Sequence, residues 1–200
     1  MYSSICSAGR TAYQSEKEGN EEKFIKSLIS MGHESVLEHV SFSVRFICDR
    51  GVSHELVRHR LASFTQESTR YCKYENDVTF VIPPWVDLAE GKYDTLLPEP
   101  VSTTVWFYAM RHAELAYLDL LEEGWTPQQA RTVLPNSLKT EIVMTANLRE
   151  WRHFFKLRVL GTTGKPHPQM VELASPLLTE CRFILPYVFG DLRKADNASS

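Results

Sequence analysis

Basic and hydroxyl-bearing side chains are concentrated in residues 54–73, which read HELVRHRLASFTQESTRYCK. An Arg-His-Arg triplet occupies residues 58–60, and Arg70 follows after a run of Ser, Thr and Gln residues. Arginine guanidinium groups match phosphate oxygens in a bidentate geometry, and hydroxyl groups fill the remaining acceptor positions. The stretch therefore predicts a site for a phosphorylated ligand. A solvated, salt-bridged surface is the alternative, because Glu55 and Glu67 lie in the same stretch.

A second basic segment, NLREWRHFFKLR, covers residues 147–158. On a helix its aromatic residues share one face, and residues 149, 152, 153 and 156 form a basic face opposite. At 100° per residue, Arg158 projects with Trp151 and Phe154 towards the core. A buried arginine needs an anionic or strongly polar partner. Otherwise the side chain reaches solvent past the helix end, or the helix stops earlier.

Composition limits the classes of protein that this chain can belong to. With 22 basic and 25 acidic residues among 200, the net charge is −3, which excludes a globally basic nucleic-acid coat. Hydrophobic residues make up 43% and charged residues 24%, as in ordinary globular proteins. No apolar run is long enough to span a membrane. The four cysteines include no CxxC pair, so we expect reduced thiols and a cytoplasmic protein.

Motifs for common cofactor sites are absent from the sequence. There is no GxGxxG, and GTTGK at residues 161–165 lacks the glycine spacing of a Walker A motif. His33 and His39 flank two glutamates, but the spacing is not HExxH, and we expect no metal.

The hydrophobic pattern predicts a single α+β domain over residues 1–200. Alternation predicts a strand over residues 40–48, and further strands are expected at 78–82 and 139–145. Residues 61–73 read as a polar loop. Helices do not alternate regularly with these strands, which argues against a doubly wound nucleotide fold. Helices are predicted over residues 21–31, 52–60, 100–123, 148–158 and 168–188, and a short helix is predicted to start at Thr126-Pro127.

Several segments resemble the flavin-dependent thymidylate synthases. The triplet at residues 58–60, followed after seven residues by Ser68, matches their RHRx7S signature. The likeness continues over residues 9–190, nearly the whole chain. The other segments that carry it are GHESVLEH at 32–39, STRY at 68–71, ARTVLPNSLKTE at 130–141, TANLREWRHFFKLR at 145–158 and HPQM at 167–170.

This resemblance implies a reaction and an assembly. The family converts dUMP to dTMP for dTTP biosynthesis, with 5,10-methylenetetrahydrofolate as carbon donor, and NADPH reduces FAD, which then delivers hydride. No enzyme cysteine adds to the base. The resemblance also implies a homotetramer with FAD bound where subunits meet, no nucleic-acid or membrane partner, and a cytoplasmic location.

The resemblance further assigns roles to individual residues. Arg158 is the implied catalytic residue, whose cation favours negative charge on the uracil ring as it accepts hydride. The implied FAD contacts are Ser35, Arg58, His59, Arg60, Gln66, Asn147, Arg149 and His153. The implied dUMP contacts are Glu55, Arg58, Gln66, Glu67, Ser68, Thr69, Arg70, Arg131 and Arg158.

The sequence departs from the family pattern at three places. Residues 65–67 read Thr-Gln-Glu where many members have Asn-Glu and an apolar residue, and Glu55 replaces a glutamine of some relatives. An acid beside an anionic nucleotide needs a proton or a hydrogen-bonded neighbour. Relatives also carry an additional segment before Gly9, which predicts a truncated N-terminus with a strand missing.

Two other functions remain open from the sequence. A nucleic-acid-binding module would use the basic helix face of residues 149–156, although the acidic total and the core-facing aromatics argue against it. An enzyme-like relative that binds nucleotide without turnover would share every motif above.

Overall fold

The computed structural model describes residues 1–14, 20–93 and 100–193, and it divides into two compact units. Unit 1 comprises Met1–Val44, His59–Phe64 and Met144–Ser200, and unit 2 comprises Arg45–Arg58 and Thr65–Val143. The boundary between the two units falls within each of the three strands of the chain's sheet.

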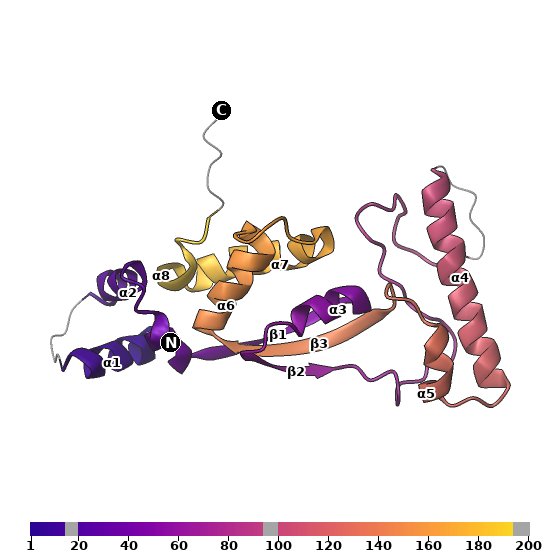
Figure 1. Ribbon diagram of the computed structural model, residues 1–200, viewed down its shortest axis with the longest axis horizontal. Coiled ribbons are helices and arrows are strands. Elements are labelled where there is room, and N and C mark those ends of the chain that lie inside the picture. Colours follow the sequence, from indigo (N-terminus) through magenta and orange to yellow (C-terminus); the bar gives the residue numbers. More distant parts are fainter. Residues whose placement is uncertain (15–19, 94–99, 194–200) are drawn as a thin grey trace. The chain divides into compact units, whose positions relative to one another are not determined.

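A three-stranded sheet has the order β1-β3-β2. Its strands are β1 (Ser41–Asp49), β2 (Ala62–Gln66) and β3 (Lys139–Asn147). Burial alternates along β3, where every second side chain is fully buried, as expected for a strand with one face on the core. The combination of helices with this small sheet confirms the predicted α+β class (Figure 1).

Unit 1 consists mainly of helices. In Figure 1, α1 lies beside α2, and α8 follows directly from α7. The aromatic face of α6 supplies the core: the ring of Trp151 stacks on Phe42 of β1 at 4.8 Å, and Phe155 meets Phe189 of α8 at 5.7 Å. The helical segments of this unit are α1 (Tyr2–Tyr13), α2 (Glu21–Ser30), η1 (Glu34–His39), α6 (Leu148–Phe155), η3 (Lys156–Leu160), α7 (Pro168–Ile184) and α8 (Pro186–Phe189).

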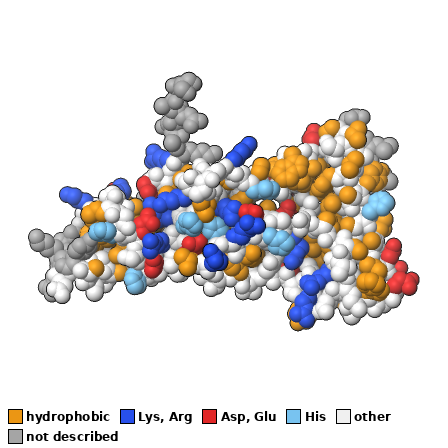
Figure 2. Space-filling view, in the orientation of Figure 1, with side chains coloured by type: hydrophobic (Ala, Val, Ile, Leu, Met, Phe, Trp, Pro, Cys, Tyr) orange, Lys and Arg blue, Asp and Glu red, His pale blue; other side chains and the backbone are white. Residues whose placement is uncertain are grey.

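Unit 2 has its own small core around α4 (Val101–Glu122). Tyr117 of this helix packs with Val78, Ala130 and Leu138, all buried. Hydrophobic side chains also gather on the outer surface of the α4 region (Figure 2), where the exposed residues of the helix include Val101, Val105 and Leu115. The other helical segments of this unit are α3 (Arg50–Leu56), α5 (Pro127–Ala130) and η2 (Arg131–Val133).

Predicted helices are confirmed where a helical hydrophobic pattern is bounded by a residue that starts or ends a helix. α2 ends before Gly32, whose φ of 76° is the left-handed conformation that glycine adopts without strain. α4 likewise ends before Gly124, with φ of 86°. At α5, the Thr126 backbone N–H donates to Gln129 Oε1 at 2.9 Å, and Pro127 occupies the first turn.

Two predictions about strands were wrong. Residues 62–66, predicted as loop, form β2, whose side chains alternate between half-buried and exposed at the edge of the sheet. Residues 78–82, predicted as a strand, make only one isolated bridge, between Phe80 and Leu138. Pro83 and Pro84 follow at once and have no N–H to extend the pairing.

Helix boundaries also differ from the prediction. α3 begins at Arg50, because Asp49 Oδ1 accepts from the Val52 N–H at 2.6 Å, and it ends at Leu56. α7 ends at Ile184, and Pro186 opens the separate α8. The helix α1 was not predicted.

The predicted helix over residues 148–158 changes geometry along its length. α6 ends at Phe155 and continues as a π-helical turn, Lys156–Leu160, that contains Arg158. Such turns occur frequently at functional sites. Among the described residues, no helix is both long and apolar enough to cross a membrane.

Candidate functional site

The two basic motifs of the sequence meet inside unit 1. His59, between α3 and β2, is buried with 4% of its surface exposed. Its Nδ1 lies 2.9 Å from Glu150 Oε1 on α6, and the Nε–H of Arg158 donates to its Nε2 at 3.1 Å. The RHR triplet and the arginine that ends the aromatic helix are thus joined through one imidazole.

Packing and charge around His59 fix its ionisation. Its ring meets Phe154 edge-on at 5.1 Å and His153 at 5.9 Å. Burial lowers the pKa of His59, and the Arg158 and His153 charges lower it further, while Glu150 opposes them. His59 is therefore neutral at physiological pH.

One partner of Arg158 is a neutral imidazole, a strongly polar group of the kind that the sequence allowed. The arginine is half-buried in the π-helical turn. Its guanidinium has two terminal nitrogens in addition to the Nε that faces His59. Those nitrogens can donate to an acceptor while Nε holds the group in place.

Predicted FAD contacts gather where α6 begins and along η1, both in unit 1. Asn147 caps α6, since its Oδ1 accepts from the Glu150 N–H at 2.9 Å. Arg149 pairs with Glu38 of η1 at 2.5 Å, and both side chains are about half exposed. His153 and Ser35 are exposed. A cation and an amide lie at the N-terminus of α6, an imidazole in its last turn and a hydroxyl on η1. A helix N-terminus with such groups suits an anionic dinucleotide.

The two arginines of the triplet differ in setting from the histidine between them. The side chains of Arg58, in unit 2, and Arg60, in unit 1, are exposed, whereas His59 is buried. Their guanidinium groups are accessible to a ligand.

Predicted nucleotide contacts come together in unit 2. Arg131 of η2 donates to the buried Thr69 Oγ1 at 3.1 Å, and Arg70 Nε donates to Gln128 Oε1 of α5 at 2.8 Å. The backbone N–H groups of residues 71 and 72 donate to the Ser68 carbonyl, which tightens the turn. The segment that follows β2 is therefore fixed against α5 and η2 by one guanidinium group from each side, Arg70 of the segment and Arg131 of η2.

Gln66 makes two side-chain hydrogen bonds within the fold that its position in the sequence does not predict. Its Nε2 donates to Ser53 Oγ of α3 at 2.9 Å and to Thr140 Oγ1 of β3 at 3.2 Å. Both amide protons are thus used within unit 2, and its carbonyl oxygen is the group available to a ligand. Glu55, also assigned to nucleotide, is a half-buried residue of α3.

The Glu67 carboxylate offers an acceptor in the same unit. Its Oε1 accepts from the Tyr74 hydroxyl at 3.2 Å, and burial together with this carboxylate raises the pKa of Tyr74. Glu67 Oε2 is buried and has no hydrogen-bond partner among the described residues. A buried acceptor of this kind fits an N–H donor of a ligand.

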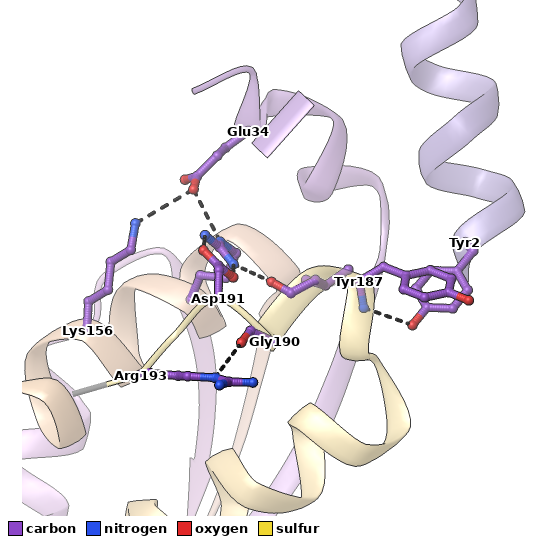
Figure 3. Close-up of polar contacts among 9 residues, drawn as sticks. Tyr2, Glu34, Lys156, Tyr187, Gly190, Asp191 and Arg193 are labelled. Atoms are coloured by element: carbon purple, nitrogen blue, oxygen red, sulfur yellow. Dashed lines mark hydrogen bonds and ion pairs between the residues drawn. The ribbon is translucent and has the colours of Figure 1, made fainter. Parts of the chain in front are cut away.

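Arg152, predicted on the solvent face of its helix, is instead almost completely buried in unit 1, and that prediction was wrong. Its Nη1 and Nη2 each donate to the Asp191 carboxylate at 2.7 Å, and Nε donates to Glu34 at 3.2 Å. The carbonyl of Val188 accepts as well. Lys156 approaches Glu34 from the other side at 3.7 Å (Figure 3). Two carboxylates, 118 and 39 residues away in the sequence, supply the partners that burial requires, and helical periodicity cannot show such pairings.

Two residues of these clusters escaped the sequence analysis. Gln128 belongs to the short helix α5, and its place in the first turn of that helix was the only sequence signal that could have pointed to it. Glu150 follows the N-cap residue Asn147 by three positions, which is the spacing of a capping box. Because that spacing already explains a glutamate here, the sequence gives no sign of another role. One ligand atom from each of His59, Glu150 and His153 lies within 4.8 Å of the others. Both ring nitrogens of His59 are, however, already hydrogen bonded.

Comparison with known proteins identifies the family. The family model of the thymidylate synthase complementing protein matches residues 2–187. Proteins named flavin-dependent thymidylate synthase are similar to the chain: that of Pyrococcus furiosus is 37% identical over 152 residues, and that of Mycobacterium avium 35% over 201 residues. These alignments cover 74% and 94% of the chain.

The relatives are longer proteins. The aligned part spans 58% of the Pyrococcus furiosus protein and 78% of the Mycobacterium avium protein. A third relative, from Geobacter sulfurreducens, is 35% identical over 84% of the chain and 68% of its own length. With the family model matching residues 2–187, the chain belongs to the thymidylate synthase complementing protein family.

Proposed function

We propose that this chain is a flavin-dependent thymidylate synthase that converts dUMP to dTMP with 5,10-methylenetetrahydrofolate as carbon donor and NADPH as reductant. The observation that carries the proposal is the contact of Arg158 Nε with His59 Nε2 inside unit 1. It joins the RHR triplet to the arginine that the family resemblance makes catalytic. The relatives of this chain are named for the same activity.

Within this proposal, most of the flavin contacts are residues of unit 1, and Arg58 and Gln66 are residues of unit 2. The exposed groups at the start of α6 and on η1 bind the anionic portion of the flavin, with Arg60 of the triplet. Bound FAD, reduced by NADPH, supplies the hydride for the reductive methylation. The residues in this role are Ser35, Arg58, His59, Arg60, Gln66, Asn147, Arg149 and His153.

Most of the proposed dUMP contacts are residues of unit 2, and Arg158 is a residue of unit 1. Arg70 and Arg131 bind the phosphate of dUMP, and the Ser68 and Thr69 hydroxyls fill its remaining acceptors. The buried Oε2 of Glu67 accepts from a donor on the base. Arg158 stabilises negative charge on the uracil ring as hydride arrives. Glu55, Arg58 and Gln66 complete the proposed set.

The proposed assembly is a homotetramer in the cytoplasm, with FAD bound where subunits meet. The exposed apolar side chains of α4 supply surface for such contacts. Sedimentation of the FAD-loaded protein tests the assembly.

An omission assay tests the function. The protein is supplied with FAD, NADPH, dUMP and 5,10-methylenetetrahydrofolate, and dTMP is measured by chromatography with each component left out in turn. Formation of dTMP that depends on all four supports the proposal. The proposal is contradicted if the protein binds dUMP and FAD but forms no dTMP, or if it binds oligonucleotides instead.

A further inference from the structure

Glu150 has a position that the reaction proposed above does not yet use. It lies in the first turn of α6, its side chain is 5% exposed, and its Oε1 is 2.9 Å from His59 Nδ1. It lies within TANLREWRHFFKLR, a segment that carries the family resemblance, but the resemblance assigns it no role. Burial of a carboxylate this deep costs desolvation free energy unless a specific hydrogen-bond partner offsets that cost.

The protons along the contact can be assigned from the chemistry of arginine. An arginine Nε always carries hydrogen and only donates, so His59 Nε2 must accept from Arg158 at 3.1 Å. The imidazole proton then sits on Nδ1 and is donated to Glu150 Oε1. Each of the three groups thereby has one defined role in a continuous chain of hydrogen bonds.

The opposite tautomer would break this chain. With its proton on Nε2, His59 would point an N–H at the N–H of Arg158, and its bare Nδ1 would face a carboxylate. Both contacts would then pair like with like. The charged imidazolium would add a cation beside the guanidinium inside a buried setting, which the Arg158 and His153 charges and the loss of solvation disfavour.

We propose that Glu150 is a positioning residue: its carboxylate selects the Nδ1–H tautomer of His59, whose Nε2 then holds Arg158 Nε and aims the guanidinium at the uracil ring. This inference rests on the proposed function, because it assigns Arg158 a task in that reaction. In serine proteases, an acid that sets the tautomer of a histidine acts in the same physical way.

The decisive variant is Glu150→Gln. The amide keeps the shape of the side chain, but its NH2 group can donate to His59 Nδ1 and so favour the Nε2–H tautomer. A purely structural carboxylate would be replaced with little effect on turnover. The matched control is Asp191→Asn, which removes a carboxylate from a different ion pair of α6, the pair with Arg152.

Two measurements are made on the FAD-loaded protein, in the presence of a metal chelator. The first is the ¹⁵N spectrum of histidine-labelled protein, in which the His59 signals are assigned by His59→Gln and report which nitrogen carries the proton. The second is steady-state dTMP formation, with kcat and the KM for dUMP determined separately.

We expect the parent and Asp191→Asn to show His59 protonated on Nδ1 alone. Glu150→Gln should shift that proton towards Nε2 and lower kcat about tenfold or more, with the KM for dUMP changed less than about threefold. A parent protein with His59 protonated on Nε2 or on both nitrogens would overturn the inference. So would a Glu150→Gln protein with the parent's tautomer and kcat.

Other results separate this inference from the function on which it rests. If the parent forms no dTMP under any condition, the proposed function fails, and the role of Glu150 in that reaction fails with it. If the parent is active and only the Glu150→Gln result is negative, the inference alone fails. Activity that the chelator abolishes and Zn²⁺ restores would make His59, Glu150 and His153 metal ligands, and would also overturn it.

Discussion

Arg158 and His59 are 99 positions apart in the sequence, yet the Nε–H of one donates to the Nε2 of the other at 3.1 Å. The contact forms because α6 gives way to a π-helical turn at Lys156, which carries the arginine beside the buried imidazole. This contact fixes the Nε edge of the guanidinium. The arrangement gives the first prediction.

Replacement of Arg158 should affect turnover more than flavin binding. We expect Arg158→Ala to lower kcat for dTMP formation about a hundredfold, because it removes the cation that stabilises charge on the uracil ring. The flavin should stay bound, since the exposed groups of α6 and η1 remain. Absorbance of the bound flavin and steady-state kinetics measure the two effects. Parent-like turnover in this variant would remove Arg158 from the reaction.

Ser68 should contribute to nucleotide affinity. Its backbone carbonyl accepts from the N–H groups of residues 71 and 72, which holds the turn, while its hydroxyl accepts from the Arg70 N–H at 3.4 Å. We expect Ser68→Ala to weaken dUMP binding about tenfold, as for one hydrogen bond to a charged group, with flavin reduction by NADPH unchanged. Calorimetric titration of dUMP and stopped-flow absorbance give the two values. An unchanged dUMP affinity would refute the assignment.

The ion pair between Asp191 and Arg152 should make stability depend on pH. Although burial alone would raise the pKa of Asp191, the Arg152 guanidinium lowers it below the ordinary value of 3.8. The folded state thus binds this proton less readily than the unfolded state. Its contribution is present above pH 3.8 and is lost as pH falls through the lower folded value.

Urea unfolding of the parent and of Asp191→Asn at several pH values tests this expectation. The difference in free energy of unfolding should be constant above about pH 5 and should shrink as pH falls below the ordinary carboxyl value. Asp119→Asn, on the exposed side of α4, is the control and should show no such trend. A difference between parent and Asp191→Asn that grows as pH falls would contradict the sign.

The cysteines should differ sharply in reactivity. Cys72 is exposed, whereas burial raises the pKa of Cys48 to about 12 and that of Cys181 to about 11, and also raises that of Cys6. Only thiolates react rapidly with disulfide reagents. At pH 8 we expect one fast-reacting thiol, absent in Cys72→Ser, and parent-like turnover in that variant. Loss of turnover in Cys72→Ser would point to cysteine chemistry that the proposed reaction excludes.

The fold could be predicted where local pattern and burial agree. The alternation of residues 40–48 predicted β1 and the end signals of residues 100–123 predicted α4, both to within one residue, and Thr126-Pro127 predicted the start of α5. β2 escaped because its sequence, ASFTQ, is mostly polar, and only its pairing in the sheet makes it a strand. At residues 78–82 the opposite occurred, since a β-prone sequence formed a single bridge.

The site was predicted in parts. The residue types of 58–70 and 147–158 indicated an anionic ligand, and the structure brings Arg131 to Thr69 and Arg158 to His59. The burial of Arg152 could not be predicted, because its partner Asp191 is 39 residues away. Glu150 could not be predicted either, since its spacing from Asn147 already had a local explanation as a helix start.

The central claim is that this chain holds FAD and uses it to methylate dUMP. Its most direct test is the visible spectrum of the FAD-reconstituted protein under anaerobic conditions, recorded as NADPH and then dUMP with 5,10-methylenetetrahydrofolate are added. We predict that NADPH bleaches the flavin absorbance, and that the second addition restores it with formation of dTMP. A correctly folded protein that takes up no flavin, or whose reduced flavin persists without dTMP, would contradict the account.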